Sequence, residues 1–467
     1  MVKPRTESLG SLLLGAALVA LLGSPAAAQT FNSGSTGADG PFNPTCTPTP
    51  CTVTVALSPS GIFNFTTIII PAGVTVKFTR NAANTPVILL AQGAVTVSGT
   101  LEVSGGNAGP FGRPGAGGPG GFDGGAGADG ISITAGGFGL GPGGGGGGSG
   151  ATGGGGGGYL TGGGGGYNPY GVQGGTGGPA YGSAALRPIL GGSGGGGGGA
   201  TSGTGGGGGG GGGGALLLAS STSISLGTSA GVVAIRANGG QPGNVYSREG
   251  GSGSGGAIRL IANTISGVGQ LLAQAGAGAG YGGQGANGRI RLEATTLTYA
   301  GTSTPLPTNA YPQPVFPSAG QPSLTIASVG GIAAPASPSG SLLAAPDILL
   351  PMTTTNPIEV ALTASNIPLG TVIQVTATPQ SGAKTTANSS GLTGTLASST
   401  ATASVTLSLT QVNVLTATAT FPLVASAGEG PLYADGEEVT HIKVAALLGG
   451  GSTVTYLTRT GREVAIN

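Results

Sequence analysis

The stretch SGTGGGGGGGGGGALLLASSTSISL, residues 202–226, decides how this chain is interpreted. Ten consecutive glycines, Gly205–Gly214, run without a polar break into Ala215 and three leucines, a pattern typical of a buried β-strand. A flexible spacer has no reason to end directly at a core strand. Two interpretations of the glycine are therefore open: a hydrated, flexible loop, or a structure that packs.

The composition separates this chain from collagen and from ordinary disordered proteins. Of its 467 residues, 105 are Gly, 38% are hydrophobic and only 6% are charged, and the formal net charge is +1. The absence of a strict Gly-X-Y period excludes collagen, and disordered chains usually combine low hydrophobicity with high charge. Without a basic stripe to displace counterions from phosphates, we expect no nucleic-acid partner.

The N-terminus has the pattern of a secretory signal peptide. Lys3 and Arg5 precede an apolar run over 12–22, and the small residues Ala26 and Ala28 suit cleavage before Gln29. We therefore expect a signal peptide over 1–28 and a secreted protein, extracellular or at the cell surface. No later apolar stretch reaches the ~20 residues of a membrane-spanning helix, so we expect no membrane span in the mature chain.

The two cysteines, Cys46 and Cys51, flank a turn that contains prolines. In an oxidising compartment this spacing favours a local disulfide, which in the chain-entropy model contributes only about 2 kcal/mol because the loop is short. A metal or redox pair would need CxxC-like spacing or a nearby His, and the sequence has neither. We expect no cofactor and no metal.

Four stretches of the chain share one layout. Each begins with an apolar strand that ends in a small residue and continues through a polar turn into a second, alternating strand; the first three add a third strand. Coils of three short strands cannot bury an apolar face alone, but stacked coils form a parallel β-helix. The sequence therefore predicts an all-β protein with a parallel β-helix over 29–317. The four stretches are 87–109, 216–240, 258–280 and 290–305.

Alternation within the repeats predicts the register of the stack. The Ile and Leu residues on either side of Arg259 and Arg291 should point inward, which turns the arginines and Glu293 outward. The same alignment places Glu102 beside Arg236. We expect these charges to lie on solvated faces, where a surface pair contributes at most ~1 kcal/mol.

The glycine-rich insertion, residues 105–214, has spaced rather than scattered glycine runs. Runs begin at positions 143, 153, 162, 194 and 205, with turn-like interruptions between them. Side-chain-free segments in the polyproline-II conformation can approach closely enough to hydrogen-bond laterally, a polyglycine-II-like arrangement. The aromatic residues of the insertion are then either anchors within a bundle or exposed adhesive contacts; they are Tyr159, Tyr167, Tyr170, Tyr181, Phe111, Phe122 and Phe138.

Five segments of the chain resemble those of a known group of proteins. They are FNFTTIIIPAGVTVKF, NAANTPVILLAQGAVTVSGTLEVSGGN, GGPGGFDGG, GGSGSGGAIRLIANTISG and GRIRLEA. They resemble a group of secreted, glycine-rich bacterial proteins with parallel β-helix repeats, over roughly 31–317. The glycine-rich part is more loosely similar to the polyglycine-II sandwiches of phage adhesin tips and of a small antifreeze protein. The resemblance implies a structural or surface-binding role and no catalytic residues.

Beyond a Pro-rich join, glycine falls and alternating Thr, Ser, Val and Ala rise. Five alternating strands between 322 and 422 have the spacing of an Ig-like β-sandwich, and the tail, 423–467, offers further strands around YADGEEV and GGGSTVTYL. The lone His441 lies near Asp435, Glu437 and Glu438, a grouping that a solvated Asp-Gly hairpin turn explains. A tail strand could pair with a strand of its own chain or with the edge of a neighbouring molecule.

No constellation of catalytic residues is found, and we expect no enzyme. The primary interpretation is a secreted structural protein of the bacterial cell surface or extracellular matrix that self-associates, with filaments as one form, or binds other surface proteins. The alternative is an adhesin that recognises polysaccharide, a cell surface or ice. The two differ in whether the protein retains such a ligand.

Overall fold

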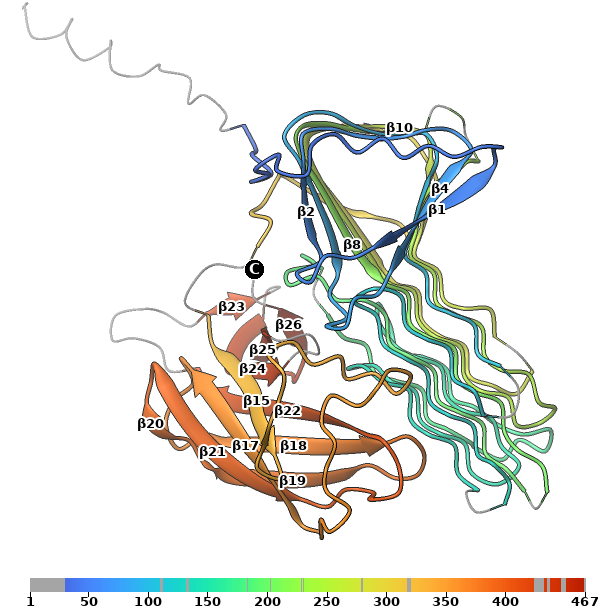
Figure 1. The fold of residues 1–467 in the computed structure, drawn as a ribbon, viewed down its shortest axis with the longest axis vertical. Coiled ribbons are helices and arrows are strands. Elements are labelled where there is room, and N and C mark those ends of the chain that lie inside the picture. Colours follow the sequence, from blue (N-terminus) through green and yellow to red (C-terminus); the bar gives the residue numbers. More distant parts are fainter. Residues whose placement is uncertain are drawn as a thin grey trace, which may run out of the picture.

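The computed structural model describes residues 30–109, 112–131, 134–182, 184–201, 203–227, 229, 231–278, 280–316, 321–423, 432–434, 437–446 and 451–465. Within these ranges the chain is all-β and forms no helix. Three parts are seen in Figure 1: a stack of parallel strands, a bundle of extended glycine segments that projects from it, and a C-terminal antiparallel sheet. The expected signal peptide, 1–28, lies outside the described residues.

Parallel strands form the walls of the stack. One wall has the order β1 (Cys51–Ala56), β4 (Val74–Thr79), β7 (Thr100–Glu102), β9 (Val233–Arg236), β11 (Gln270–Leu272) and β13 (Ser303–Thr304). The next has the order β2 (Ile62–Phe65), β5 (Val87–Ala91), β8 (Ala215–Leu226), β10 (Ala257–Gly267), β12 (Arg289–Tyr299) and β14 (Thr308–Ala310). β3 (Ile68–Ile70) and β6 (Val95–Val97) continue onto the second half of β8 and make a third wall. The triangular section is visible in Figure 1.

The predicted register of the stack is confirmed. Ile258 pairs with Ile290 and Leu260 with Leu292, and all four side chains are buried in one continuous apolar core. Glu102 lies opposite Arg236 and forms an ion pair with it at 3.1 Å. Branched apolar residues at every second position thus fill the interior of the stack, as the period of two requires.

The expectation of solvated charges on this stack is wrong for Arg259 and Glu293. Both point away from the interior, yet both side chains are 0% exposed. Two segments remote in sequence cover this outer face: carbonyls of Pro314 and Val315 accept hydrogen bonds from Arg259, and the apolar residues of 181–190 pack on the sheet.

The glycine segments pack laterally and are called the glycine lattice below. The lattice comprises 103–109, 112–118, 121–128, 134–140, 143–148, 152–158, 162–167, 173–178, 191–200, 205–214, 238–243, 249–256, 274–278 and 281–288. It therefore extends beyond the predicted insertion, 105–214, because the chain also leaves the stack at 238–256 and 274–288 and returns. Figure 1 shows these segments running alongside one another.

Hydrogen bonds in the lattice repeat every three residues. In 205–214 the N–H groups of Gly206, Gly209 and Gly212 donate to 121–128, those of Gly207, Gly210 and Gly213 to 248–254, and those of Gly208, Gly211 and Gly214 to 103–109. Carbonyls of the same segment accept from 112–118, 192–198 and 240–243. The segment is thus surrounded by three accepting and three donating neighbours, which satisfies its buried backbone groups.

Close approach explains why the central segments contain only glycine. A Cβ added at any position from Gly206 to Gly214 would come closer than 3.0 Å to a backbone carbonyl oxygen. None of these residues has a positive φ, so the requirement is for space and not for an unusual backbone conformation. At the border of the lattice, by contrast, Gln284 and Asn287 recur at the spacing of three residues and are exposed.

The C-terminal part is a curved antiparallel sheet around its own apolar core. Its strands are β15 (Ser323–Val329), β16 (Ile332–Ala333), β17 (Ile358–Ser365), β18 (Val372–Pro379), β19 (Thr385–Gly391), β20 (Thr393–Thr395), β21 (Ser398–Val405), β22 (Asn413–Pro422), β23 (Tyr433–Ala434), β24 (Glu437–Ala446), β25 (Ser452–Thr458) and β26 (Glu463–Ala465). Their order is β16-β15-β17-β21-β19-β18-β22-β24-β25-β26, with β20 on β21 and β23 on β24. The tail strand β24 pairs with β22 of the same chain.

Asp123 joins the glycine lattice to the C-terminal sheet. Its carboxylate forms an ion pair with Arg80, accepts the hydroxyl of Ser341 and the N–H of Leu342, and is fully buried. Beside it, Phe122 and Leu140 of the lattice form an apolar cluster with Leu342 and Val414. The two parts are therefore in direct contact.

Candidate functional site

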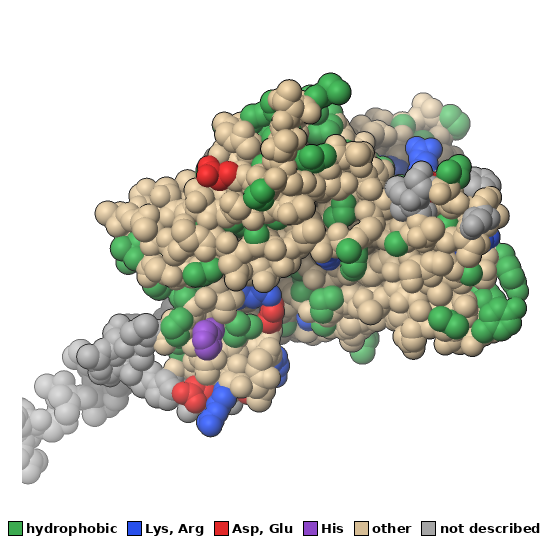
Figure 2. Space-filling view, turned by 90° about the horizontal axis from the view of Figure 1, so that it is seen from below, with side chains coloured by type: hydrophobic (Ala, Val, Ile, Leu, Met, Phe, Trp, Pro, Cys, Tyr) green, Lys and Arg blue, Asp and Glu red, His purple; other side chains and the backbone are tan. Residues whose placement is uncertain are grey.

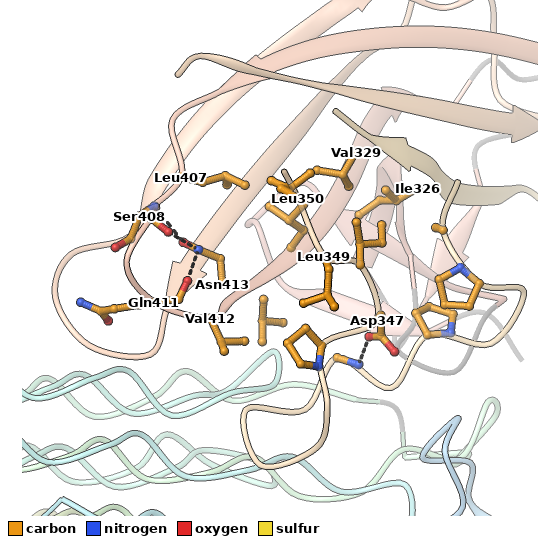
Figure 3. Close-up of a pocket in the computed structure, with 18 of the residues that line it drawn as sticks. Ile326, Val329, Asp347, Leu349, Leu350, Leu407, Ser408, Gln411, Val412 and Asn413 are labelled. Carbon is orange, nitrogen blue, oxygen red and sulfur yellow. Dashed lines mark hydrogen bonds between the residues drawn. The ribbon is translucent and has the colours of Figure 1, made fainter. Parts of the chain in front are cut away.

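A concave site lies in the C-terminal part. A pocket of about 600 Å³ opens between the segment 334–354 and the strands β15 and β22. Figure 3 shows Leu349 and Val412 at its mouth, close to the glycine segments below. The irregular backbone of 334–354 reflects its prolines, which cannot donate to a sheet ladder.

The walls of the pocket are apolar. Side chains from the sheet and from the irregular segment contribute, and Leu349 and Met352 stay exposed at the rim. The apolar residues labelled in Figure 3 are Ile326, Val329, Leu349, Leu350, Leu407 and Val412. Such a lining suits an apolar molecule or an apolar segment and offers little to a polar one.

Polar groups around the pocket are engaged within the protein. The carboxylate of Asp347 accepts the N–H groups of Ser339 and Gly340, both at 2.9 Å. The Asn413 amide donates to the carbonyls of Ser408 and Gln411 at 2.7 and 2.9 Å. These bonds order the loops that line the pocket, so Asp347 and Asn413 have a structural role there.

A second candidate is the charged cluster on the outer face of the parallel stack. Arg259 donates Nε and Nη2 to the two oxygens of Glu293, at 2.9 and 3.1 Å, and Arg291 donates Nε to Glu293 at 2.7 Å. Arg187 lies nearby; burial lowers its pKa, and the positive charges of Arg259 and Arg291 lower it further. The carboxylate is held by two arginines and by the Gln313 N–H, so it has a structural role.

The remaining residues considered from sequence divide between structural and exposed positions. Cys46 and Cys51 are joined in a disulfide. Glu437 accepts the hydroxyl of Thr460, and hydrogen bonds from Thr458 and Thr460 lower its pKa, while His441 is exposed and Asp435 lies outside the described residues. Among the residues that the structure describes, no group of three or more His, Cys, Asp or Glu could hold a metal ion.

The aromatic residues of the glycine lattice divide between buried and exposed positions. Tyr159 and Tyr181 are buried, their ring centroids lie 4.6 Å apart, and their hydroxyls donate to the carbonyls of Leu190 and Gly191. Burial raises the pKa of both hydroxyls, and the positive charge of Arg289 lowers it by a smaller amount. Tyr167 and Tyr170 are exposed, Phe122 is buried, and Phe111 lies outside the described residues.

Charge is sparse on the visible face of the molecule. Figure 2 shows few Lys, Arg, Asp and Glu side chains, and they form no large patch of one sign on this face. One exposed cation, Lys384, has its ammonium 4.5 Å from the ring centroid of Phe138, and desolvation of that ammonium lowers its pKa. Within the described ranges no helix is long and apolar enough to cross a membrane.

No family model, no curated protein and no solved structure matches this chain. The candidate sites are therefore described from the geometry of this chain alone. Sequence reasoning missed the pocket, whose signal was the segment 335–352, rich in Pro and Leu but without the alternation of a strand.

Proposed function

We propose that the protein is a secreted structural protein of the cell surface or extracellular matrix that self-associates. In this proposal the parallel stack is a β-helix, the glycine lattice is a polyglycine-II-like slab and the C-terminal sheet is an Ig-like module. The three-residue period of hydrogen bonds and the six neighbours of 205–214 support the second of these assignments.

The single observation that carries the proposal is the Cβ-free interior of the lattice. Every N–H from Gly206 to Gly214 donates to another segment, and no side chain fits there. Ordering a glycine costs roughly 0.5 to 1 kcal/mol more than ordering Ala, so only dense lateral bonding offsets the entropy lost. The result is a rigid slab that offers no side chains for chemistry, which suits a scaffold.

The first strand of the stack supports self-association. β1 pairs on one edge only, with β4, and lies at the end of its sheet. Since the N–H of Cys51 donates inward to Gly73, the alternation of a parallel strand turns the N–H groups of Thr52 and Thr54 toward the open edge. Head-to-tail pairing of such an edge with the last strands of another molecule would generate a filament.

Sedimentation velocity and negative-stain microscopy of the mature protein test this proposal. We expect concentration-dependent assembly that Thr54→Pro abolishes, because proline removes the edge donor, and that the matched control Thr54→Val retains. Monomers alone at every protein and salt concentration would reject the self-association.

A further inference from the structure

Three tyrosines meet at the end of the glycine lattice that lies away from the parallel stack. Tyr167 ends the segment 162–167, Tyr246 lies in the turn before 249–256, and Tyr281 begins 281–288. The Tyr281 ring is 5.7 Å from that of Tyr167 and 6.0 Å from that of Tyr246, at 87° to each. Tyr246 and Tyr167 are 74% and 45% exposed, so their rings are accessible.

A buried carboxylate with one unpartnered oxygen lies against the backbone that precedes Tyr281. Glu249 is 3% exposed, and its Oε2 has no hydrogen-bond partner. A Cβ added at Gly280 would lie 2.6 Å from Glu249 Oε1, which places the carboxylate against the backbone next to Tyr281. Burying a charge without a partner is costly, and natural proteins leave few such groups unsatisfied.

The turns that carry these residues are fixed by the lattice. The Tyr167 N–H donates to the Tyr281 carbonyl at 3.0 Å, and the Gly154 N–H donates to the Glu249 carbonyl at 2.9 Å. Desolvation raises the pKa of Tyr281, and its neighbours Tyr246 and Glu249 raise it further, which agrees with their proximity. Rings and carboxylate are thus pre-positioned without a ligand.

The three rings and the carboxylate at this end of the lattice favour an organic cation as the ligand. The faces of aromatic rings carry negative potential, and clustered aromatic rings are the kind of environment that recognises alkylated ammonium groups. A polysaccharide chain would need ring faces aligned in one plane, whereas Tyr281 is perpendicular to both neighbours. The unsatisfied Oε2 of Glu249 adds an acidic group that a cationic ligand would complement.

We propose that Tyr167, Tyr246, Tyr281 and Glu249 form a binding site for an alkylated ammonium group, with a quaternary ammonium such as that of choline as the best fit. Such a group occurs free, on surface polymers and on lipid headgroups. The site recognises the shared ammonium chemistry.

Saturation-transfer NMR of the mature protein with choline chloride tests the proposal, with the neutral isostere 3,3-dimethyl-1-butanol beside it. We expect millimolar binding of choline, binding of the isostere weaker by about tenfold, and loss of about tenfold in choline affinity in Glu249→Gln. Tyr246→Leu should weaken binding by about threefold to tenfold. Tyr170→Leu, an exposed tyrosine with no ring contact to the cluster, is the matched control and should bind as the wild type does.

Amide hydrogen exchange of each variant shows whether the lattice is intact, so a folding defect is separated from a lost contact. Co-sedimentation with phosphatidylcholine vesicles distinguishes a lipid headgroup from a free or polymer-borne ammonium group. Equal binding of the isostere, unchanged affinity in Glu249→Gln, binding of neutral oligosaccharides instead, or no choline binding at about 50 mM would each overturn the proposal.

Discussion

Arg259 on β10 and Glu293 on β12 form a bidentate ion pair that solvent does not reach. Their side chains are both 0% exposed, and Arg291 shares the same carboxylate. The pair lies outside the apolar core of the stack, beneath segments that come from elsewhere in the chain. Substitutions in this pair therefore test the attachment of those segments as well as the stability of the stack.

Glu293→Leu should destabilise the protein more than Arg259→Met. Removing the carboxylate leaves Arg259 buried without an anion, which typically costs about 3 to 5 kcal/mol, whereas removing Arg259 leaves Glu293 with Arg291. Urea denaturation measures the difference. The matched control is Glu102→Gln, since the Glu102–Arg236 pair is partly exposed and should contribute at most ~1 kcal/mol. Equal costs at both sites would contradict this assignment.

Gly209→Ala should disrupt the glycine lattice, whereas Gly165→Ala should not. A Cβ at Gly209 would strike the Gly195 carbonyl, but one at Gly165 would meet no atom closer than 3.6 Å. We expect a cost of roughly 1 to 3 kcal/mol or more from overpacking at Gly209. Gly165→Ala should be neutral, or should stabilise the protein by about 0.4 to 1 kcal/mol, because Ala lowers the conformational entropy of the unfolded chain. Thermal melts of both variants measure this, and equal melting temperatures would argue against close packing at Gly209.

Alkaline pH should unfold the lattice. The pKa values of Tyr159 and Tyr181 are raised above 10.0 by burial, so the unfolded chain loses these protons first. Between pH 10 and the higher folded pKa values the native state binds more protons, and stability falls as pH rises. Below pH 10 these two tyrosines contribute no slope. The free energy of unfolding, measured from pH 8 to 12, should fall less steeply in Tyr159→Phe; an unchanged slope would exclude Tyr159 as a source.

Asp123→Asn should loosen the C-terminal sheet from the lattice. The substitution removes the charge that pairs with Arg80 and weakens acceptance from Ser341 and Leu342. Calorimetry should then resolve two transitions in place of coupled unfolding, with Ser341→Ala giving a smaller effect because the Leu342 N–H still donates to the charged Asp123. A single transition of unchanged shape in Asp123→Asn would show that other contacts provide the coupling.

The sequence was sufficient for the register of the stack, because alternation has a period of two and one face is buried. It could not show that Arg259 and Glu293 are covered, since the covering residues Pro314, Val315 and 181–190 are distant along the chain. Local alternation says which way a side chain points, and only tertiary packing decides what lies above it.

The extent of the lattice was likewise underestimated. The segments 238–256 and 274–288 are not pure glycine and lie at the ends of the predicted repeats or between them, so composition alone predicts a lattice only over 105–214. Their available signal was a non-glycine residue at the spacing of three, such as Gln284 and Asn287, which places side chains at a lattice border. The Tyr246–Tyr281 contact could not be predicted, because it forms between the tips of two separate excursions.

Amide hydrogen exchange across 191–214, measured by mass spectrometry with overlapping peptides, tests the central claim most directly. Because each N–H from Gly206 to Gly214 is buried and bonded to a neighbouring segment, we predict protection comparable to that of β8 and β10. The N–H groups of Gly162 and Gly165, which are exposed and have no partner, should exchange quickly as an internal control. Complete exchange of Gly206–Gly214 within the dead time would contradict the lattice.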